Sequence, residues 1–235
     1  MEWIGEALLI GVRRHGESSV IAETMVVGRG RCLGLVRGGR ASRMAATLQP
    51  GNSVQLTWRA RLENHLGLFT VELLQARAAE LIADRTRLYL AQLVFDHLRL
   101  LPERDPHDRL LGMALRLIDN PPDGAALARF ELALLDELGF GLDLSACAVT
   151  GTSDDLTHVS PRTGRAVCRA EAAPYLDRLL PLPSFLTVRG NASPPDIAAA
   201  LRLTGHFLAM HVWDPRQLTP SPTRELLAEM LSREG

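Results

Sequence analysis

Arginines dominate the stretch from Thr24 to Leu62, which contains no aspartate or glutamate. A guanidinium group can donate two parallel hydrogen bonds to one phosphate, so arginines spread over one face can neutralise the backbone of a nucleic acid. The arginines for which we predict this role are Arg37, Arg40, Arg13, Arg14, Arg29, Arg31, Arg43, Arg59 and Arg61. The first two flank Gly38-Gly39, where the backbone can approach a phosphate closely. A solvated face without a ligand fits the same pattern equally well.

Two aromatic residues near these arginines bear on the same choice. Trp58 and Phe69 would supply stacking surfaces for unpaired bases if they faced outward. The alternative is a solvated barrel with Trp58 in its core.

The charge of the chain is distributed unevenly, although its net value is only -1. Residues 1–75 hold nine Arg and six Glu, whereas residues 76–235 carry a net negative charge. This asymmetry favours an N-terminal part that binds a polyanion. All 26 basic residues are Arg, which an arginine-biased, GC-rich genome explains more simply than phosphate binding does.

A second motif with chemical potential is Arg14-His15-Gly16-Glu17, which follows an apolar run. It resembles the signature of the histidine phosphatases, in which the histidine accepts a phosphoryl group. That chemistry also needs a second active-site histidine, and a helix would follow the motif. Because residues 20–27 have the pattern of a strand, we favour a polar loop between two strands.

Cys147 and Cys168 are spaced like the two ends of a zinc ribbon. Such a site needs a Cys-x-x-Cys pair at each end, but the partner positions hold Thr150 and Glu171. Threonine does not bind zinc, and His158 would be only a third ligand. We therefore predict a hairpin that packs without metal, and no other cofactor.

Apolar runs separated by glycines predict five strands, over residues 6–12, 20–27, 31–36, 54–61 and 66–73. A short helix is predicted over residues 41–48, before Pro50-Gly51. Three strands, a short helix and two strands form the element order of an OB-fold, a five-stranded barrel that commonly binds oligonucleotides. Cys32 is predicted to lie in its core.

From Gln75 the hydrophobic period becomes that of helices. We predict one long helix through Leu101, then helices over residues 110–118, 125–138, about 171–180, 195–211 and 222–231. Gly139 would end the third helix in the left-handed conformation, and residues 142–170 are predicted to be irregular. The predicted fold class is α+β, with an OB-fold domain at 1–75 and a mainly α-helical domain at 76–235.

The N-terminus does not have the pattern of a secretory leader, because Glu2, Trp3 and Glu6 replace the cationic segment and apolar core. No apolar run approaches the roughly 20 residues of a membrane span. We expect a cytoplasmic protein with reduced thiols.

The order of several stretches resembles the bacterial recombination mediator family RecO. The stretches that carry the resemblance are Arg13–Ser18, Gly34–Arg40, Leu48–Gly51, Asn64–Leu74, Phe130–Leu142 and Cys147–Cys168, the last with Ser160–Gly164 inside it. The resemblance implies an N-terminal OB-fold followed by a helical domain that carries a zinc finger. Many members have four cysteines there, whereas this chain keeps two, which implies a degenerate zinc-finger-like hairpin at 142–170.

The resemblance also implies a DNA-repair protein that is not an enzyme and is associated with the nucleoid. Members bind single- and double-stranded DNA, anneal complementary strands, and engage the acidic-hydrophobic tail of single-stranded DNA-binding protein (SSB). They work with RecR, and in many bacteria with RecF, to load RecA onto coated single strands. For the tail, we expect an apolar groove with an arginine at its rim, supplied by Arg129 and Phe130 or by Arg202. A phosphatase using His15 and an OB-fold adaptor that binds only proteins remain the alternatives.

Overall fold

The structure is a computed structural model, and it describes residues 1–62, 64–188 and 190–232. The chain divides into two compact units, Met1–Pro121 and Pro122–Gly235. The first unit combines strands with helices, and the second is mainly helical. The predicted α+β class is therefore confirmed.

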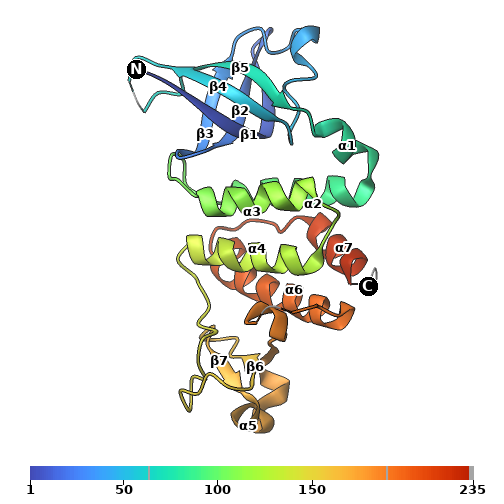
Figure 1. Cartoon of the computed structure of the whole chain (residues 1–235). Coiled ribbons are helices and arrows are strands. Elements are labelled where there is room, and N and C mark those ends of the chain that lie inside the picture. The colour runs from blue at the N-terminus through green and yellow to red at the C-terminus, as the bar shows by residue number, and fades with distance from the viewer. Residues whose placement is uncertain (63, 189, 233–235) are drawn as a thin grey trace. The chain divides into compact units, whose positions relative to one another are not determined.

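Five strands of the first unit close into a barrel (Figure 1). The strands are β1 (Glu2–His15), β2 (Ser19–Val26), β3 (Gly30–Val36), β4 (Ser53–Arg59) and β5 (Leu68–Gln75). Their order around the barrel is β1-β2-β3-β5-β4. Neighbours are antiparallel except β3 and β5, which pair in parallel at Leu35 and Leu68. The five predicted strands are confirmed, with ends that differ by a few residues.

The predicted helix over residues 41–48 is wrong, because only Ser42–Met44 forms a short 3-10 turn. The side-chain amide of Asn52 donates to the carbonyls of Ala46 at 2.8 Å and Thr47 at 3.2 Å. These carbonyls therefore face a buried side chain instead of continuing a helix. Side chains that compete for backbone groups in this way favour turns over helices.

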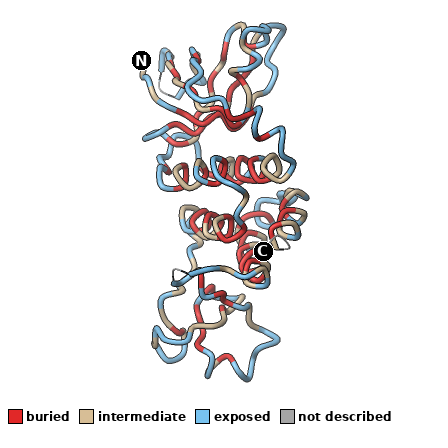
Figure 2. The backbone as a smooth tube through the Cα atoms, turned by 45° about the vertical axis from the view of Figure 1, so that its right-hand side comes forward, coloured by how far each residue is buried: buried red, intermediate tan, exposed pale blue. Residues whose placement is uncertain are grey.

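The barrel core is formed by alternating apolar positions of its strands, and Figure 2 shows buried residues concentrated along them. Trp58 and Phe69 each expose only 4% of their surface and belong to this core, as does Cys32. A Cβ atom on Gly34 would lie 2.4 Å from the Phe69 ring, so the glycine makes room for the aromatic side chain. Of the two orientations that the sequence left open for these aromatic residues, the one toward the core is therefore observed.

Three helices complete the first unit: α1 (Ala78–Ala83), α2 (Arg85–Leu98) and α3 (Asp108–Asp119). The prediction of one long helix through Leu101 is wrong because the chain breaks at Asp84, whose φ of -123° and ψ of 118° are extended. The Asp84 carboxylate accepts a hydrogen bond from the amide of Arg87 and caps the start of α2.

Buried polar groups attach these helices to the barrel. The Asn52 side-chain oxygen accepts from the amides of Arg77 at 2.9 Å and Ala78 at 3.1 Å, where α1 begins. The buried Arg77 guanidinium also bonds to Ser53 and pairs with Asp119. The compact unit therefore continues beyond the end of β5 at Gln75 to Pro121.

The second unit is built around two helices that pack together, α4 (Gly124–Glu137) and α6 (Pro194–Leu208). Gly139 has a φ of +84° just after α4, as predicted. The remaining elements are β6 (Leu156–Val159), β7 (Ala166–Cys168), α5 (Arg169–Ala172), a 3-10 helix (Ala173–Arg178), β8 (Leu180–Pro181), a 3-10 turn (Ser184–Leu186), a π-helical turn (Ala209–Trp213) and α7 (Pro222–Leu231). The three strands form a small sheet in the order β7-β6-β8. No helix among the described residues is long and apolar enough to cross a bilayer.

Candidate nucleic-acid interface

One group of predicted arginines gathers at the end of the barrel where β1 turns into β2. Arg13 and Arg14 lie at the end of β1, opposite Ile21 and Val20 of β2. Val20 in turn pairs with Val36 of β3, and Arg37 and Arg40 follow in the turn after this strand. We define the hairpin-end cluster as the exposed residues Arg13, Arg14, Arg37, Arg40 and Arg43.

Arg40 ties the two turns of this cluster together. Its amide donates to the carbonyl of Ser18 at 3.1 Å, and its guanidinium donates to the carbonyls of Gly16 and Glu17. The turn after β3 is thereby held beside the β1–β2 turn. Arg37, which makes no such contact in the described structure, projects from the same turn and is exposed. The cluster thus presents several cations on one fixed pair of turns.

The other exposed arginines lie at the opposite end of β2, and we call Arg29, Arg59 and Arg61 the tryptophan-end group. The Arg29 guanidinium lies 4.8 Å from the centre of the Trp3 ring. Arg59 pairs with Glu2 at 2.8 Å, and the hydrogen bond from Arg59 lowers the pKa of the Glu2 carboxyl. Eight residues of β2 separate the two groups, about 25 Å at ~3.3 Å per residue.

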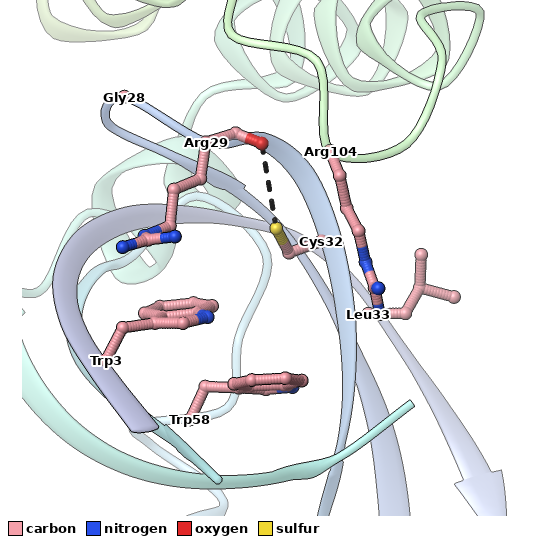
Figure 3. A pocket seen from close by; sticks show the side chains of 7 residues that line it. All are labelled: Trp3, Gly28, Arg29, Cys32, Leu33, Trp58 and Arg104. Carbon is pink, nitrogen blue, oxygen red and sulfur yellow. Dashed lines mark hydrogen bonds between the residues drawn. The ribbon is translucent and has the colours of Figure 1, made fainter. Parts of the chain in front are cut away.

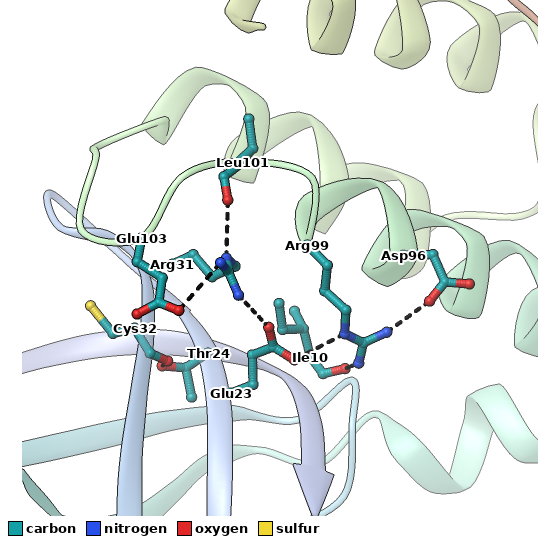
Figure 4. A network of polar contacts seen from close by, with 9 residues as sticks. All are labelled: Ile10, Glu23, Thr24, Arg31, Cys32, Asp96, Arg99, Leu101 and Glu103. Carbon is teal, nitrogen blue, oxygen red and sulfur yellow. Dashed lines mark hydrogen bonds and ion pairs between the residues drawn. The ribbon is translucent and has the colours of Figure 1, made fainter. Parts of the chain in front are cut away.

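Arg31 is the predicted arginine that the structure uses within its own unit (Figure 4). Its guanidinium pairs with Glu23 at 2.8 Å and with Glu103 at 3.4 Å, and it also donates to the carbonyl of Leu101. The Arg31 side chain is only 17% exposed. Glu23 also accepts from Arg99 at 2.9 Å. Because its charge is already balanced, we exclude Arg31 from the candidate interface.

His15 lies at the end of a strand, next to the turn of residues 16–18. It is the last residue of β1, pairs with Ser19, and is exposed. The element that follows is β2, in place of the helix that a phosphatase would have there. The interpretation as a loop between two strands is confirmed.

The segment between Cys147 and Cys168 brings the two cysteines and Thr150 together. The amide of Cys168 donates to the sulfur of Cys147 at 3.3 Å, and the hydroxyl of Thr150 lies 3.9 Å from the sulfur of Cys168. Burial raises the pKa of Cys147, but hydrogen bonds from Thr150 and from the backbone of Cys168, Thr150 and Val149 lower it to about 6.

These residues do not fit a zinc site. Threonine is not a zinc ligand, and Thr150 occupies the place of a third sulfur. Among the residues that the structure describes, no three His, Cys, Asp or Glu side chains come together as a metal site would require. The prediction that residues 142–170 are irregular is wrong in part, because β6 and β7 lie in this segment and pair with each other.

A groove of about 820 Å³ lies in the second unit between α6, the π-helical turn and α7. Leu201, Trp213 and Ala228 give it apolar walls, and exposed Arg202 stands on the α6 side. Glu225 and Glu229 line the α7 side. The groove therefore combines an apolar floor with one basic and one acidic wall.

The alternative partner residues on α4 are engaged inside the unit. Phe130 is fully buried. Arg129 donates to the carbonyl of Phe185 at 3.1 Å and lies over the Phe185 ring. Of the three predicted partner residues, Arg202 alone lines the groove.

Comparisons with known proteins cover almost the whole chain. Residues 1–77 match the family description "Recombination protein O N terminal", and residues 82–218 match "Recombination protein O C terminal". The DNA repair protein RecO of Chelativorans sp. is 56% identical, over 95% of this chain and 93% of its own length. The DNA repair protein RecO of Sinorhizobium medicae is 51% identical, over 96% of this chain and 92% of its own length.

Proposed function

Because this chain belongs to the RecO family of DNA repair proteins, which are not enzymes, we propose that it is a recombination mediator. It binds single- and double-stranded DNA and anneals complementary strands. With RecR, and with RecF where it is present, it helps to load RecA onto single strands coated by SSB. Because chromosomal DNA would be its ligand, we propose that the protein is located in the cytoplasm, at the nucleoid.

The hairpin-end cluster is the single observation that carries the DNA-binding part of this proposal. Its five arginines are exposed, and the turns that hold them are fixed to each other through Arg40. The strand order of the barrel supports an OB-fold, a fold that commonly binds oligonucleotides. The tryptophan-end group extends the surface, and Arg31 is left out because it is largely buried between two carboxylates.

The spacing of the two arginine groups suggests how much DNA the barrel holds. A strand that reaches from one group to the other covers about 25 Å, which is at most about seven nucleotides, since ~3.4 Å per nucleotide is the spacing of a stacked duplex strand and an extended single strand is longer. This length lies within the range of single OB-folds, about 4 to 16 nucleotides.

Annealing follows from charge neutralisation. Two single strands repel each other through their phosphates, and cations that cover part of each backbone lower that repulsion. Contacts to phosphates leave the pairing edges of the bases accessible. We therefore propose that the barrel promotes annealing without chemical turnover.

For the partner tail, we propose the groove between α6 and α7. An acidic peptide that ends in an aromatic residue could place its ring against Leu201 and Trp213, with its carboxylates toward Arg202. The acidic α7 wall, with Glu225, fixes the orientation, because the carboxylates of the peptide would avoid it. We also propose that the hairpin around Cys147 is a zinc-finger remnant that works without metal.

Fluorescence anisotropy of labelled oligo-dT, titrated with salt, tests DNA binding. If four phosphates are neutralised, the log–log plot of affinity against salt should have a slope of about -3, at about -0.7 per phosphate. An OB-fold adaptor that binds only proteins would show no DNA affinity even at low salt, and that result would refute the proposal.

A peptide pull-down tests the groove separately. A peptide with the acidic tail and its terminal Phe should be captured, and the same peptide without the Phe should not. Equal capture of both peptides would contradict the proposed site.

A further inference from the structure

A cavity of about 120 Å³ lies beside the tryptophan-end group (Figure 3). Its walls come from β1, the β2–β3 turn, β3, β4 and the loop after α2. The lining residues are Trp3, Gly28, Arg29, Cys32, Leu33, Trp58 and Arg104. The described lining thus contains two indoles and two guanidinium groups, but no carboxylate.

The two indoles form a stacked pair. Trp3 and Trp58 are register partners on β1 and β4, and their rings lie 5.7 Å apart with planes that differ by 16°. Trp58 is buried and fixed by a hydrogen bond from its indole nitrogen to the carbonyl of Leu66. Trp3 is partly exposed, and Figure 3 shows Arg29 over the face that points away from Trp58. The outer face of this aromatic pair therefore lies under the exposed side chain of Arg29.

The backbone that carries Arg29 is anchored on both sides. The amide of Gly28 donates to the Asp108 carboxylate at 2.8 Å. A Cβ atom on Gly30 would lie only 1.7 Å from the carbonyl oxygen of Asp105, so the turn packs directly against the loop after α2. Within that loop, the amide of Arg104 donates to the carbonyl of Arg31. The backbone around the cavity is thus held by contacts within the first unit, whereas the Arg29 side chain is exposed.

We propose that this cavity binds one unpaired nucleobase of single-stranded DNA, stacked on Trp3. The inference rests on the proposed DNA-binding function and adds a base site to a surface that otherwise contacts phosphates. A flat, uncharged ring matches the face of an indole, and exposed Arg29 matches a phosphate beside that base. Arg104 borders the cavity from the other side, where its guanidinium donates to the carbonyl of His65 at 2.7 Å. The volume is well below the ~300–1,000 Å³ of sites for drug-sized molecules, so it suits a single base better than a free nucleotide or cofactor.

Arg29 acts as an exchangeable cover in this proposal. A cation–π contact at an exposed site is weaker than the stacking of a base on an aromatic side chain. An incoming base therefore displaces the guanidinium from Trp3, and Arg29 turns to the neighbouring phosphate. A base paired within a duplex cannot enter, so the cavity gives the barrel a preference for single strands.

The test compares labelled oligo-dT with an abasic oligomer that has the same number of phosphates. The wild-type chain should bind oligo-dT more tightly, by about tenfold, with the same salt slope for both. Tryptophan fluorescence should change on binding oligo-dT and stay unchanged with the abasic oligomer. Equal affinity for both oligomers would overturn the base site and leave the phosphate surface standing. Failure of both to bind would overturn the proposed function as well.

The variant Trp3→Leu keeps an apolar side chain over the barrel core but removes the aromatic face. It should lose the preference for oligo-dT, by about tenfold, and retain the affinity for the abasic oligomer. Tyr175→Leu, which removes an exposed aromatic side chain of the second unit, serves as the control and should change neither affinity. The proposal would be contradicted if Trp3→Leu weakened the binding of both oligomers equally. It would also be contradicted if the variant still bound oligo-dT more tightly than the abasic oligomer. If Trp3→Leu does not fold, the wild-type comparison decides alone.

Discussion

Replacing Arg37 and Arg40 by alanine should reduce the salt dependence of DNA binding, while the chain stays folded. Both side chains are exposed in the turn after β3. If each neutralises one phosphate, the double variant should lose about 1.4 units of log–log slope, at ~0.7 units per phosphate. A surface of four phosphates would then change from a slope of about -2.8 to about -1.4.

This change has a large effect over an ordinary range of salt. Between about 50 and 200 mM salt, the wild-type affinity should fall by about 50-fold and that of the double variant by only about sevenfold. Anisotropy of labelled oligo-dT at four or more salt concentrations measures both slopes. Circular dichroism must show that the double variant is folded, because Arg40 also bonds to the β1–β2 turn.

Two controls separate phosphate contacts from other effects of arginine. Arg162→Ala with Arg178→Ala removes the same charge from exposed positions of the second unit, and should leave the slope unchanged. Arg31→Ala should lower the melting temperature and also leave the slope unchanged, because Glu23 and Glu103 already hold its charge. An unchanged slope in the folded Arg37/Arg40 variant, or a flatter slope in Arg31→Ala, would refute the assignment.

Three further predictions concern stability, the groove and the cysteines. Glu23→Gln removes charged hydrogen bonds to Arg31 and Arg99. It should lower the free energy of unfolding by about 2 kcal/mol and the melting temperature by about 4–8 °C in thermal denaturation. An unchanged melting temperature would contradict the bridging role of Glu23. Arg202→Ala should weaken tail-peptide binding about two- to fivefold in calorimetry, whereas Glu225→Gln should strengthen it slightly; the opposite signs would exclude the proposed peptide orientation. The pKa of Cys147 is lowered to about 6 in the folded chain, whereas the pKa of a cysteine in an unfolded chain is about 8.5. Between these two pH values the unfolded chain binds more protons than the folded chain. The stability of the folded chain should therefore rise with pH over this range, and the gain should be lost as the pH falls toward 6. Urea unfolding across this range should show the rise in the wild type and lose it in Cys147→Ala; a rise of the same size in both would rule out Cys147 as its source.

The strands could be predicted from the sequence because alternation is a local signal. Each barrel strand alternates apolar and polar positions over a few residues, and glycine-rich turns mark the ends. The break at Asp84 could not be found in the same way, since apolar residues continue at helical spacing on both sides of it. One carboxylate that caps the Arg87 amide overrides that periodicity. The helix predicted over residues 41–48 failed for a similar reason, because the buried side chain of nearby Asn52 competes for the carbonyls of Ala46 and Thr47.

The candidate site was only partly predictable because exposure depends on distant partners. Arg31 has the same local surroundings as Arg29, yet its partner Glu103 and the carbonyl of Leu101 come from another part of the chain. Trp3 was missed as an aromatic platform, since only the register of β1 against β4 places it on Trp58. Thr150, in contrast, could be assessed from spacing alone: a residue that cannot bind zinc stands where a ligand would be needed.

Annealing places opposite demands on a DNA-binding surface, and the two proposed sites at the ends of this barrel would meet them differently. A protein that stacks many bases holds a strand firmly but hides the edges that must pair. Arginines that contact phosphates leave those edges accessible but bind any polyanion, duplex included. The hairpin-end cluster has arginines on fixed turns, and the tryptophan end adds one small cavity with a stacked pair of indoles. One base held at one end would select single strands, while the bases over the remaining ~25 Å stay available to a second strand. If both proposed sites act in this way, the barrel would bind single strands selectively and still permit annealing.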